Sequence, residues 1–213
     1  MPEHDISDIT LEAILGDLRA EGIDLETGTE VTHRSDVTGE IRHPILSPDA
    51  ALTRRLDVLT SRALRTLHDR RRPWTFLSIN HLVVCPAGVV IVDALDARSR
   101  PSLRLEGGTG GLRERLVVGD RDCTKRVESL LDGVRAVTRA LTRSLPEPRG
   151  IDVHGVLAWM ADDQPAPSGA FTVRGIHVIG PDRLSARVAG PGPLRFDEIE
   201  LVTAALAKAF PAA

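Results

Sequence analysis

The sequence predicts an α/β fold in which a mixed central β-sheet is flanked by helices. Val89–Val92 is a continuous β-branched run, which is typical of a strand buried on both faces. Between residues 122 and 145, apolar side chains recur at helical spacing, from Val127 to Leu145. A sheet and an amphipathic helix each bury an apolar face, so helices packed on a sheet of mixed strand direction are the economical arrangement.

The individual elements follow from local signals. Ser47-Pro48-Asp49 predicts a helix start, with a serine N-cap and proline at the first helical position, and an apolar stripe runs on to Ala63. A glycine-rich stretch at 107–111, between two apolar segments, predicts a β-hairpin. In chain order we expect a helix from 47, strands at 64–69, 76–84 and 89–92, a hairpin at 103–118, a helix at 122–145, strands at 151–160 and 171–179, and a helix at 196–210.

The first 44 residues differ from the rest of the chain. Residues 6–20 have the apolar spacing of an amphipathic helix, and residues 21–44 are polar, as in a loop, short hairpin or linker. Residues 1–49 carry twelve acidic residues and three arginines, whereas the remaining 164 carry 24 Lys and Arg against 18 acidic residues. We therefore expect an acidic N-terminal extension, 1–44, and a basic domain, 45–213. An acidic tail that aids solubility explains the extension more simply than autoinhibition does.

The composition limits the class of protein. Hydrophobic residues make up 42% and charged residues 27%, as in an ordinary globular protein. No apolar run approaches the roughly 20 residues of a membrane span. The N-terminus is acidic where a signal peptide would be basic, so we expect a cytoplasmic protein that contacts no membrane.

One motif carries a family resemblance. The stretch from Ile79 to Leu95 reads INHLVVCPAGVVIVDAL. It resembles the nuclease-related domain (NERD) family, whose members typically read I-D-H, three hydrophobic residues, G-P-x-G, four hydrophobic residues, then D/E/N-x-K. Segments 54–69, 116–125, 153–157, 169–178 and 210–212 also fit in order and spacing, and 116–125 is similar to actinobacterial members. The resemblance covers roughly residues 45–213.

The resemblance implies a restriction-endonuclease-like fold and the chemistry of PD-(D/E)XK nucleases. In such enzymes two carboxylates at strand ends hold Mg²⁺ against the scissile phosphate. A lysine two residues after the second carboxylate lies on the same face of its strand and assists the attacking water. A helix glutamate can add a further metal ligand. The corresponding positions here are Asn80, Asp93, Leu95 and Asp49.

Two of these four positions lack the required chemistry. Asn80 brings no charge for a Mg²⁺ ion that relies on carboxylates, and Leu95 can neither attract phosphate nor assist a water. Asp93 and Asp49 are the only metal ligands left, for a site that is weak or absent. The sequence thus predicts a degenerate site in a pseudonuclease with no cofactor, and Mg²⁺ only if the site is active.

Two alternatives remain open. Lys125, one of only two lysines against 25 arginines, could reach the site from the next helix and support an active, rearranged Mg²⁺-dependent nuclease. An ordinary solvated first-turn lysine is the simpler interpretation. The chain could also be a pure protein-interaction module. His81 follows Asn80, so it faces the other side of the strand, and we expect a hydrogen-bonded core histidine there.

The expected nucleic-acid surface is a basic run with a tryptophan after it. Arginines neutralise phosphates and a tryptophan can stack on a base. Only 3% of residues are aromatic and tyrosine is absent, so a solvated loop with a core tryptophan is the competing interpretation. DNA and a protein are both open as partners, and the sequence does not give the oligomeric state. The residues of this surface are Arg62, Arg65, Arg70, Arg71, Arg72 and Trp74.

Overall fold

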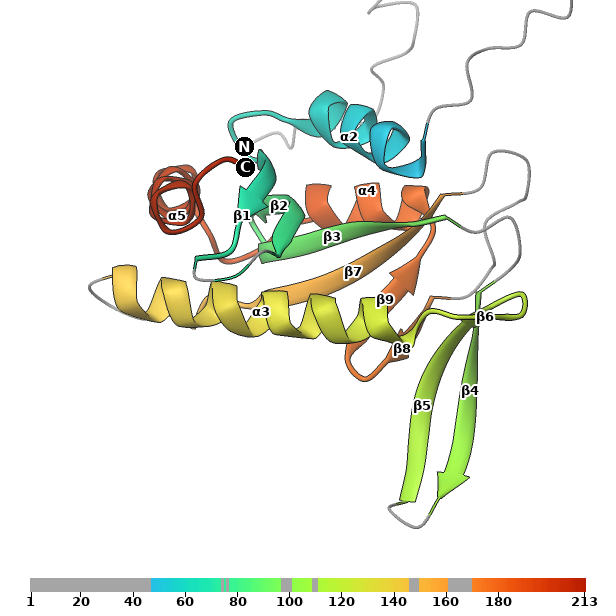
Figure 1. Ribbon diagram of the computed structural model, residues 1–213. Helices are drawn as coiled ribbons and strands as arrows, with labels where there is room; N and C mark the ends of the chain where they lie inside the picture. Colours follow the sequence, from blue (N-terminus) through green and yellow to red (C-terminus); the bar gives the residue numbers. More distant parts are fainter. Residues whose placement is uncertain are drawn as a thin grey trace, which may run out of the picture. The chain divides into compact units, whose positions relative to one another are not determined.

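A sheet of six strands, in the order β1-β2-β3-β7-β9-β8, organises the described part of the chain (Figure 1). The computed structural model describes residues 47–73, 75, 77–96, 101–108, 111–145, 150–160 and 170–213. All of them belong to one unit, residues 44–213. The predicted N-terminal extension, 1–44, and Trp74 lie outside the described residues.

The sheet is mixed, as predicted. Strands β1 (Arg65–Arg71), β2 (Ser78–Cys85) and β3 (Gly88–Asp96) are antiparallel neighbours. β3 pairs in parallel with β7 (Val153–Met160), and β7 in parallel with β9 (Ile176–Ile179). β8 (Phe171–Val173) pairs antiparallel with β9 at the edge. The chain between β3 and β7 contains helix α3 (Thr124–Ser144), the crossover that a parallel pair requires.

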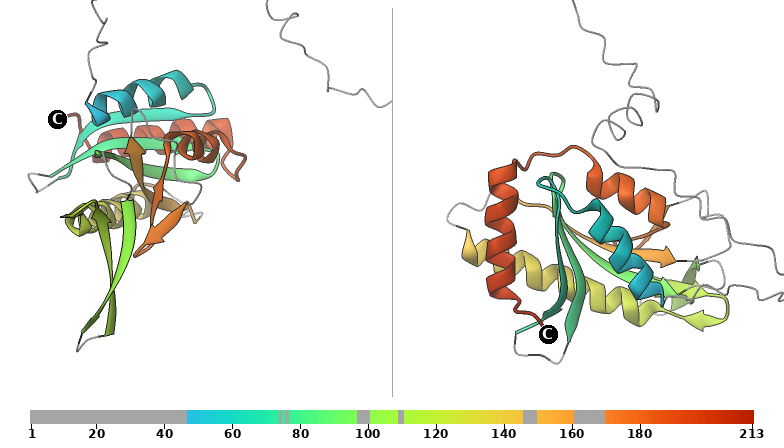
Figure 2. Two further views of the ribbon diagram at one scale, coloured as in Figure 1. Left: turned by 90° about the vertical axis from the view of Figure 1, so that its right-hand side faces the viewer. Right: turned by 90° about the horizontal axis from the view of Figure 1, so that it is seen from above.

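Helices cover both faces of the sheet (Figures 1 and 2). α3 and α5 (Phe196–Ala209) pack on one face, and α2 (Pro48–Leu59) and α4 (Pro181–Ala189) on the other. β3 contributes side chains to the hydrophobic core on each face of the sheet, because side chains alternate along a strand. Ile91 and Leu95 point towards α3, and Val90 and Val92 point towards α2. Among the described residues, no helix is long and apolar enough to cross a membrane.

The start of α2 is as predicted. The Ser47 side chain accepts a hydrogen bond from the backbone N–H of Ala50 at 3.2 Å, and proline follows at the first helical position. Leu52 and Leu56 are fully buried against the sheet. The helix ends at Leu59, before the predicted apolar stripe ends at Ala63. This docking fixes where Asp49, in the first turn, meets the sheet.

The tight turn between β2 and β3 sets their register. Gly88 has φ +119°, and a Cβ atom there would lie 2.4 Å from the Asp152 carbonyl oxygen. Val89 N–H donates to that same oxygen at 2.9 Å. The predicted Pro86-Ala87-Gly88 turn is thus present, and only glycine fits its last position without strain.

Three features differ from the prediction. The hairpin of β4 (Pro101–Gly108) and β5 (Gly111–Val118) joins β6 (Arg121–Asp122) in a second sheet, which projects from the first (Figure 2). The strand expected at 171–179 is two strands, because Arg174 and Gly175 take positive φ angles and reverse the chain. α4 was not predicted, although Pro181 starts it and Leu184 and Val188 share one buried face.

Candidate functional site

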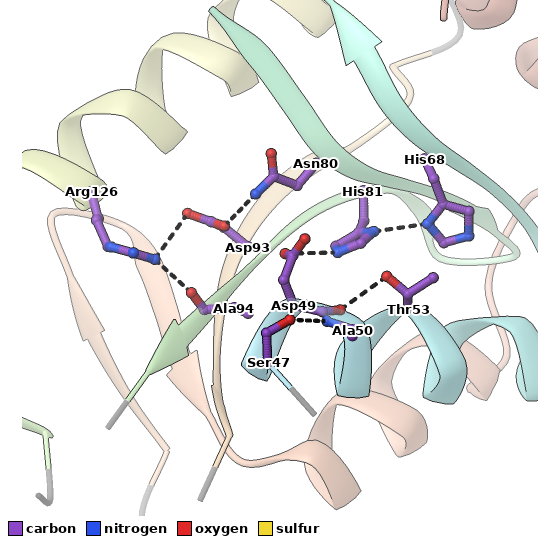
Figure 3. A network of polar contacts seen from close by, with 10 residues as sticks. All are labelled: Ser47, Asp49, Ala50, Thr53, His68, Asn80, His81, Asp93, Ala94 and Arg126. Carbon is purple, nitrogen blue, oxygen red and sulfur yellow. Dashed lines mark hydrogen bonds and ion pairs between the residues drawn. The ribbon is translucent and has the colours of Figure 1, made fainter. Parts of the chain in front are cut away.

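Asn80 and Asp93 stand side by side on neighbouring strands (Figure 3). His81 pairs with Val92 in the antiparallel register of β2 and β3, which brings Asn80 opposite Asp93. The Asn80 side-chain amide donates to Asp93 Oδ1 at 2.9 Å. A carboxylate only accepts hydrogen bonds, so the amide N–H rather than the amide oxygen faces Asp93. Asn80 therefore acts here as a donor to the carboxylate.

Arg126, in the first turn of α3, contacts the other oxygen of the same carboxylate. Its Nη1 lies 3.6 Å from Asp93 Oδ2 and donates to the Ala94 carbonyl oxygen at 2.6 Å (Figure 3). Burial raises the pKa of Asp93 above its usual value, and the Arg126 charge and the Asn80 hydrogen bond oppose that rise. Both oxygens of Asp93 thus face groups that stabilise its charge.

Asp49 reaches the site from the other face of the sheet. It stands in the first turn of α2, and its Oδ1 lies 3.4 Å from Nε2 of His81 (Figure 3). The charge of Asp49 also raises the pKa of Asp93, so the two carboxylates are near enough to repel each other. Of the residues predicted for one site, the structure therefore places Asn80 and Asp93 in contact, with Asp49 near Asp93 but in contact with His81.

His81 is buried, as predicted, with 1% of its surface exposed, but its hydrogen bonding is incomplete. Its Nδ1 lies 2.8 Å from Nδ1 of His68, whose Nε2 lies 3.0 Å from Asp57 Oδ1. The Nε2 of His81 lies towards Asp49 and has no hydrogen-bond partner among the described residues.

The residue at the lysine position has no polar group, and the proposed rescuing lysine lines a different hollow from Asp93. Leu95 is fully buried in the core between the sheet and α3, as a space-filling residue would be. Lys125 is exposed and lines an open hollow of about 830 Å³ between the hairpin and α3, which Asp93 does not line. Arg126, not Lys125, approaches Asp93. Helical spacing could have indicated this, because Arg126 is four residues before the buried Leu130.

Asp93 and Asn80 line a smaller cavity of about 270 Å³ between β2, β3 and α3. Its polar lining also includes Arg72, Ser78 and Ser129, while Ile91 and Leu130 form part of its apolar wall. Arg72 enters from the loop after β1 and donates to the Asp132 carbonyl oxygen at 3.4 Å. The cavity holds one carboxylate and one guanidinium, which suits a polar ligand that makes hydrogen bonds.

These residues do not fit a Mg²⁺ ion. Mg²⁺ requires carboxylate oxygens that are free to bind it, whereas the two oxygens of Asp93 face the Asn80 amide and the Arg126 guanidinium. In the described part of the chain, no group of three His, Cys, Asp or Glu side chains has metal-binding geometry. Arg126 supplies beside Asp93 the positive charge that a metal would supply.

The arginines of the predicted nucleic-acid surface differ in exposure and in their contacts. Arg62 and Arg71 are exposed, but Arg65 forms an ion pair with Glu200 of α5 and donates to the Ser61 carbonyl oxygen. Arg70 and Arg72 are partly buried, and the Nε of each has no hydrogen-bond partner among the described residues. Arg65 is therefore occupied by the fold, whereas the other four remain candidates for anion binding.

Comparison with known proteins adds no identification. The chain gives no match to a family model, to a curated protein or to a solved structure. The resemblance to the nuclease-related family and its restriction-endonuclease-like fold therefore remains a prediction from the sequence motifs.

Three histidines have lowered pKa values in the folded protein, so we expect acid to destabilise it. Burial lowers the pKa of His81, His154 and His177 below the ordinary 6.5, and Arg187 of α4 lowers the last two further. Below pH 6.5 the unfolded chain binds protons that the folded protein refuses, so stability falls as the pH drops. Urea unfolding at about pH 7.5 and pH 5.5 should show a lower free energy of unfolding at the acid pH.

The matched variant is His154→Gln with His177→Gln. The two rings are neighbours, with 6.2 Å between their centroids, and His154 contributes to the lowered pKa of His177. The double substitution therefore removes both titrating groups together. The loss of stability between the two pH values should then be smaller than in the wild type. An equal loss in both proteins would contradict the assignment of this pH dependence to His154 and His177.

Proposed function

We propose that this chain is a nuclease-related domain that binds the phosphodiester backbone of nucleic acid and has lost metal-dependent cleavage. The observation that carries the proposal is the pairing of Asp93. Its two oxygens face the Asn80 amide and the Arg126 guanidinium, at 2.9 and 3.6 Å. The carboxylate that should hold the metal is thus engaged within the protein.

The chemistry of these contacts favours binding over hydrolysis. A guanidinium supplies positive charge and hydrogen-bond donors in a fixed geometry, which suits phosphate recognition. It cannot replace a metal ion that activates water. Leu95, at the expected lysine position, is fully buried and has no polar atom in its side chain. A phosphate that approached this site would meet donors but no assembled hydrolytic machinery.

Charge supports a nucleic acid over a protein as the partner. Residues 50–213 carry an excess of about six positive charges, and a basic domain attracts a polyanion. Arg72, which follows the last residue of β1, lines the same cavity as Asp93. A protein partner remains the alternative if the excess of arginines serves only solubility.

The test is binding and cleavage of labelled oligonucleotides. We expect the full chain to bind single-stranded DNA or RNA, and its affinity to fall as salt rises from about 50 to 200 mM, since phosphate contacts release counterions. We expect no cleavage with Mg²⁺ or Mn²⁺ under the same conditions. Fluorescence anisotropy measures the binding, and denaturing electrophoresis detects the products.

The alternatives give different results. Binding that does not depend on salt, or no binding at low salt, would favour the protein-interaction module. Cleavage that needs Mg²⁺ and disappears in Asp93→Ala would favour the active nuclease. In that case Lys125→Gln should also lower the rate if Lys125 takes the part of the missing lysine.

A further inference from the structure

A second hollow, of about 470 Å³, lies next to the Asp93 cavity and is basic. The loop after β1, the C-terminal half of α3 and the end of α5 line it. Its charged lining residues in the described part of the chain are Arg72, Arg139 and Arg143, and none of the described lining residues is acidic. Thr75 and Ser144 add hydroxyl groups to its wall. Three positive charges without a carboxylate among the described lining residues indicate a site for an anion.

Arg139 and Arg143 are spaced to act on one anion. They are four residues apart on α3, so their Cβ atoms lie roughly 5–6 Å apart on one face of the helix. Both are exposed, and neither forms an ion pair within the described part of the chain. Nε of Arg143 donates to the Arg139 carbonyl oxygen at 3.1 Å, which leaves its terminal nitrogens for a ligand.

Arg72 joins the two cavities, because it lines both. Its Nη2 makes one long hydrogen bond, at 3.4 Å, to the Asp132 carbonyl oxygen. Its Nε is buried and lacks a hydrogen-bond partner among the described residues, which is costly for a charged donor. An anionic ligand in the hollow would offer acceptors to the terminal nitrogens of Arg72, one of which makes only the long bond to the Asp132 carbonyl oxygen.

We propose that the Arg72–Arg139–Arg143 hollow binds one backbone phosphate of the same nucleic-acid strand that enters the Asp93 cavity. The inference rests on the proposed function and deepens it, since it names where the strand runs. The strand follows α3 from the Asp93 cavity towards the C-terminal end of the helix. Arg72, between the two cavities, contacts the strand at the passage. Single strands fit best, because their backbone bends between two neighbouring hollows.

The test compares two double variants of the full chain on a labelled single-stranded oligonucleotide. Arg139→Gln with Arg143→Gln removes two charges from the hollow. Arg54→Gln with Arg104→Gln removes two charges from exposed positions on α2 and the hairpin. All four side chains are exposed, so both variants should keep the fold, and circular dichroism with urea unfolding verifies this.

We expect the variant in the hollow to bind about tenfold more weakly at 50 mM salt, regardless of base sequence. The slope of log affinity against log salt should fall by about 0.7, the contribution of one phosphate of a single strand. The control should change affinity by less than about twofold, as remote surface charges are screened.

Each outcome decides the inference. Equal weakening in the two double variants would overturn the site in this hollow and leave the proposed function standing. An unchanged affinity and salt slope in Arg139→Gln with Arg143→Gln would also overturn the site in this hollow and leave the proposed function standing. If the wild type binds no oligonucleotide at low salt, the proposed function fails and the inference fails with it.

Discussion

Leu95→Lys should destabilise the folded protein by about 3–5 kcal/mol, the usual cost of an uncompensated buried charge. Leu95 is fully buried, pairs with Trp159 of β7 and belongs to the core between the sheet and α3. A lysine there would either bury its ammonium group or force the strand away from α3. Urea unfolding should show the loss, whereas Leu95→Met, of similar volume, should cost less than about 1.5 kcal/mol.

The same comparison has a bearing on the family resemblance. If Leu95→Lys keeps nearly the stability of Leu95→Met, the lysine side chain must reach water or Asp93 past the core. The position would then suit the lysine of an active family member. A large loss would mean that the core has adapted around leucine, so that catalysis could not return by this single substitution.

The architecture was largely predictable because its signals are local. Ser47-Pro48 marks the start of α2, the β-branched run at Val89–Val92 marks β3, and apolar spacing marks α3. Two features were not predicted because they depend on backbone details. They are the chain reversal at Gly175, which divides β8 from β9, and the short helix α4. The restriction-endonuclease-like assignment remains a prediction, because a mixed sheet with helices on both faces is compatible with more than one fold.

The site was predictable only in part, because its contacts cross between elements. The motif at 79–95 identified Asn80 and Asp93, which are in contact, while Asp49 lies near Asp93 and contacts His81. Arg126 was missed in favour of the neighbouring Lys125, since one residue along a helix turns a side chain by about 100°. The His68–His81 contact depends on the register of β1 and β2, which no local pattern gives.

Asn80→Asp combined with Arg126→Gln should create a metal site at Asp93. The first change replaces a donor to Asp93 with a second carboxylate, and the second removes the cation beside Asp93. With Asp49 nearby, three carboxylates then repel one another, so the variant should be less stable without metal. Mn²⁺ or Mg²⁺ would relieve the repulsion and bind the oxygen ligands that these ions prefer.

The expected readout is a melting temperature that rises with metal in the double variant alone. Metal at about one hundred times its dissociation constant stabilises a folded protein by about 2.7 kcal/mol. For a chain of this size that corresponds to a rise of roughly 5–10 °C, which EDTA should reverse. Wild type and Arg126→Gln are the matched controls, since both keep Asn80. A rise in Arg126→Gln alone would mean that Arg126 by itself excludes the metal. No rise in either variant would mean that Asp49 and Asp93 are not placed to share an ion, and the predicted descent of this site from a metal centre would lose its geometric support.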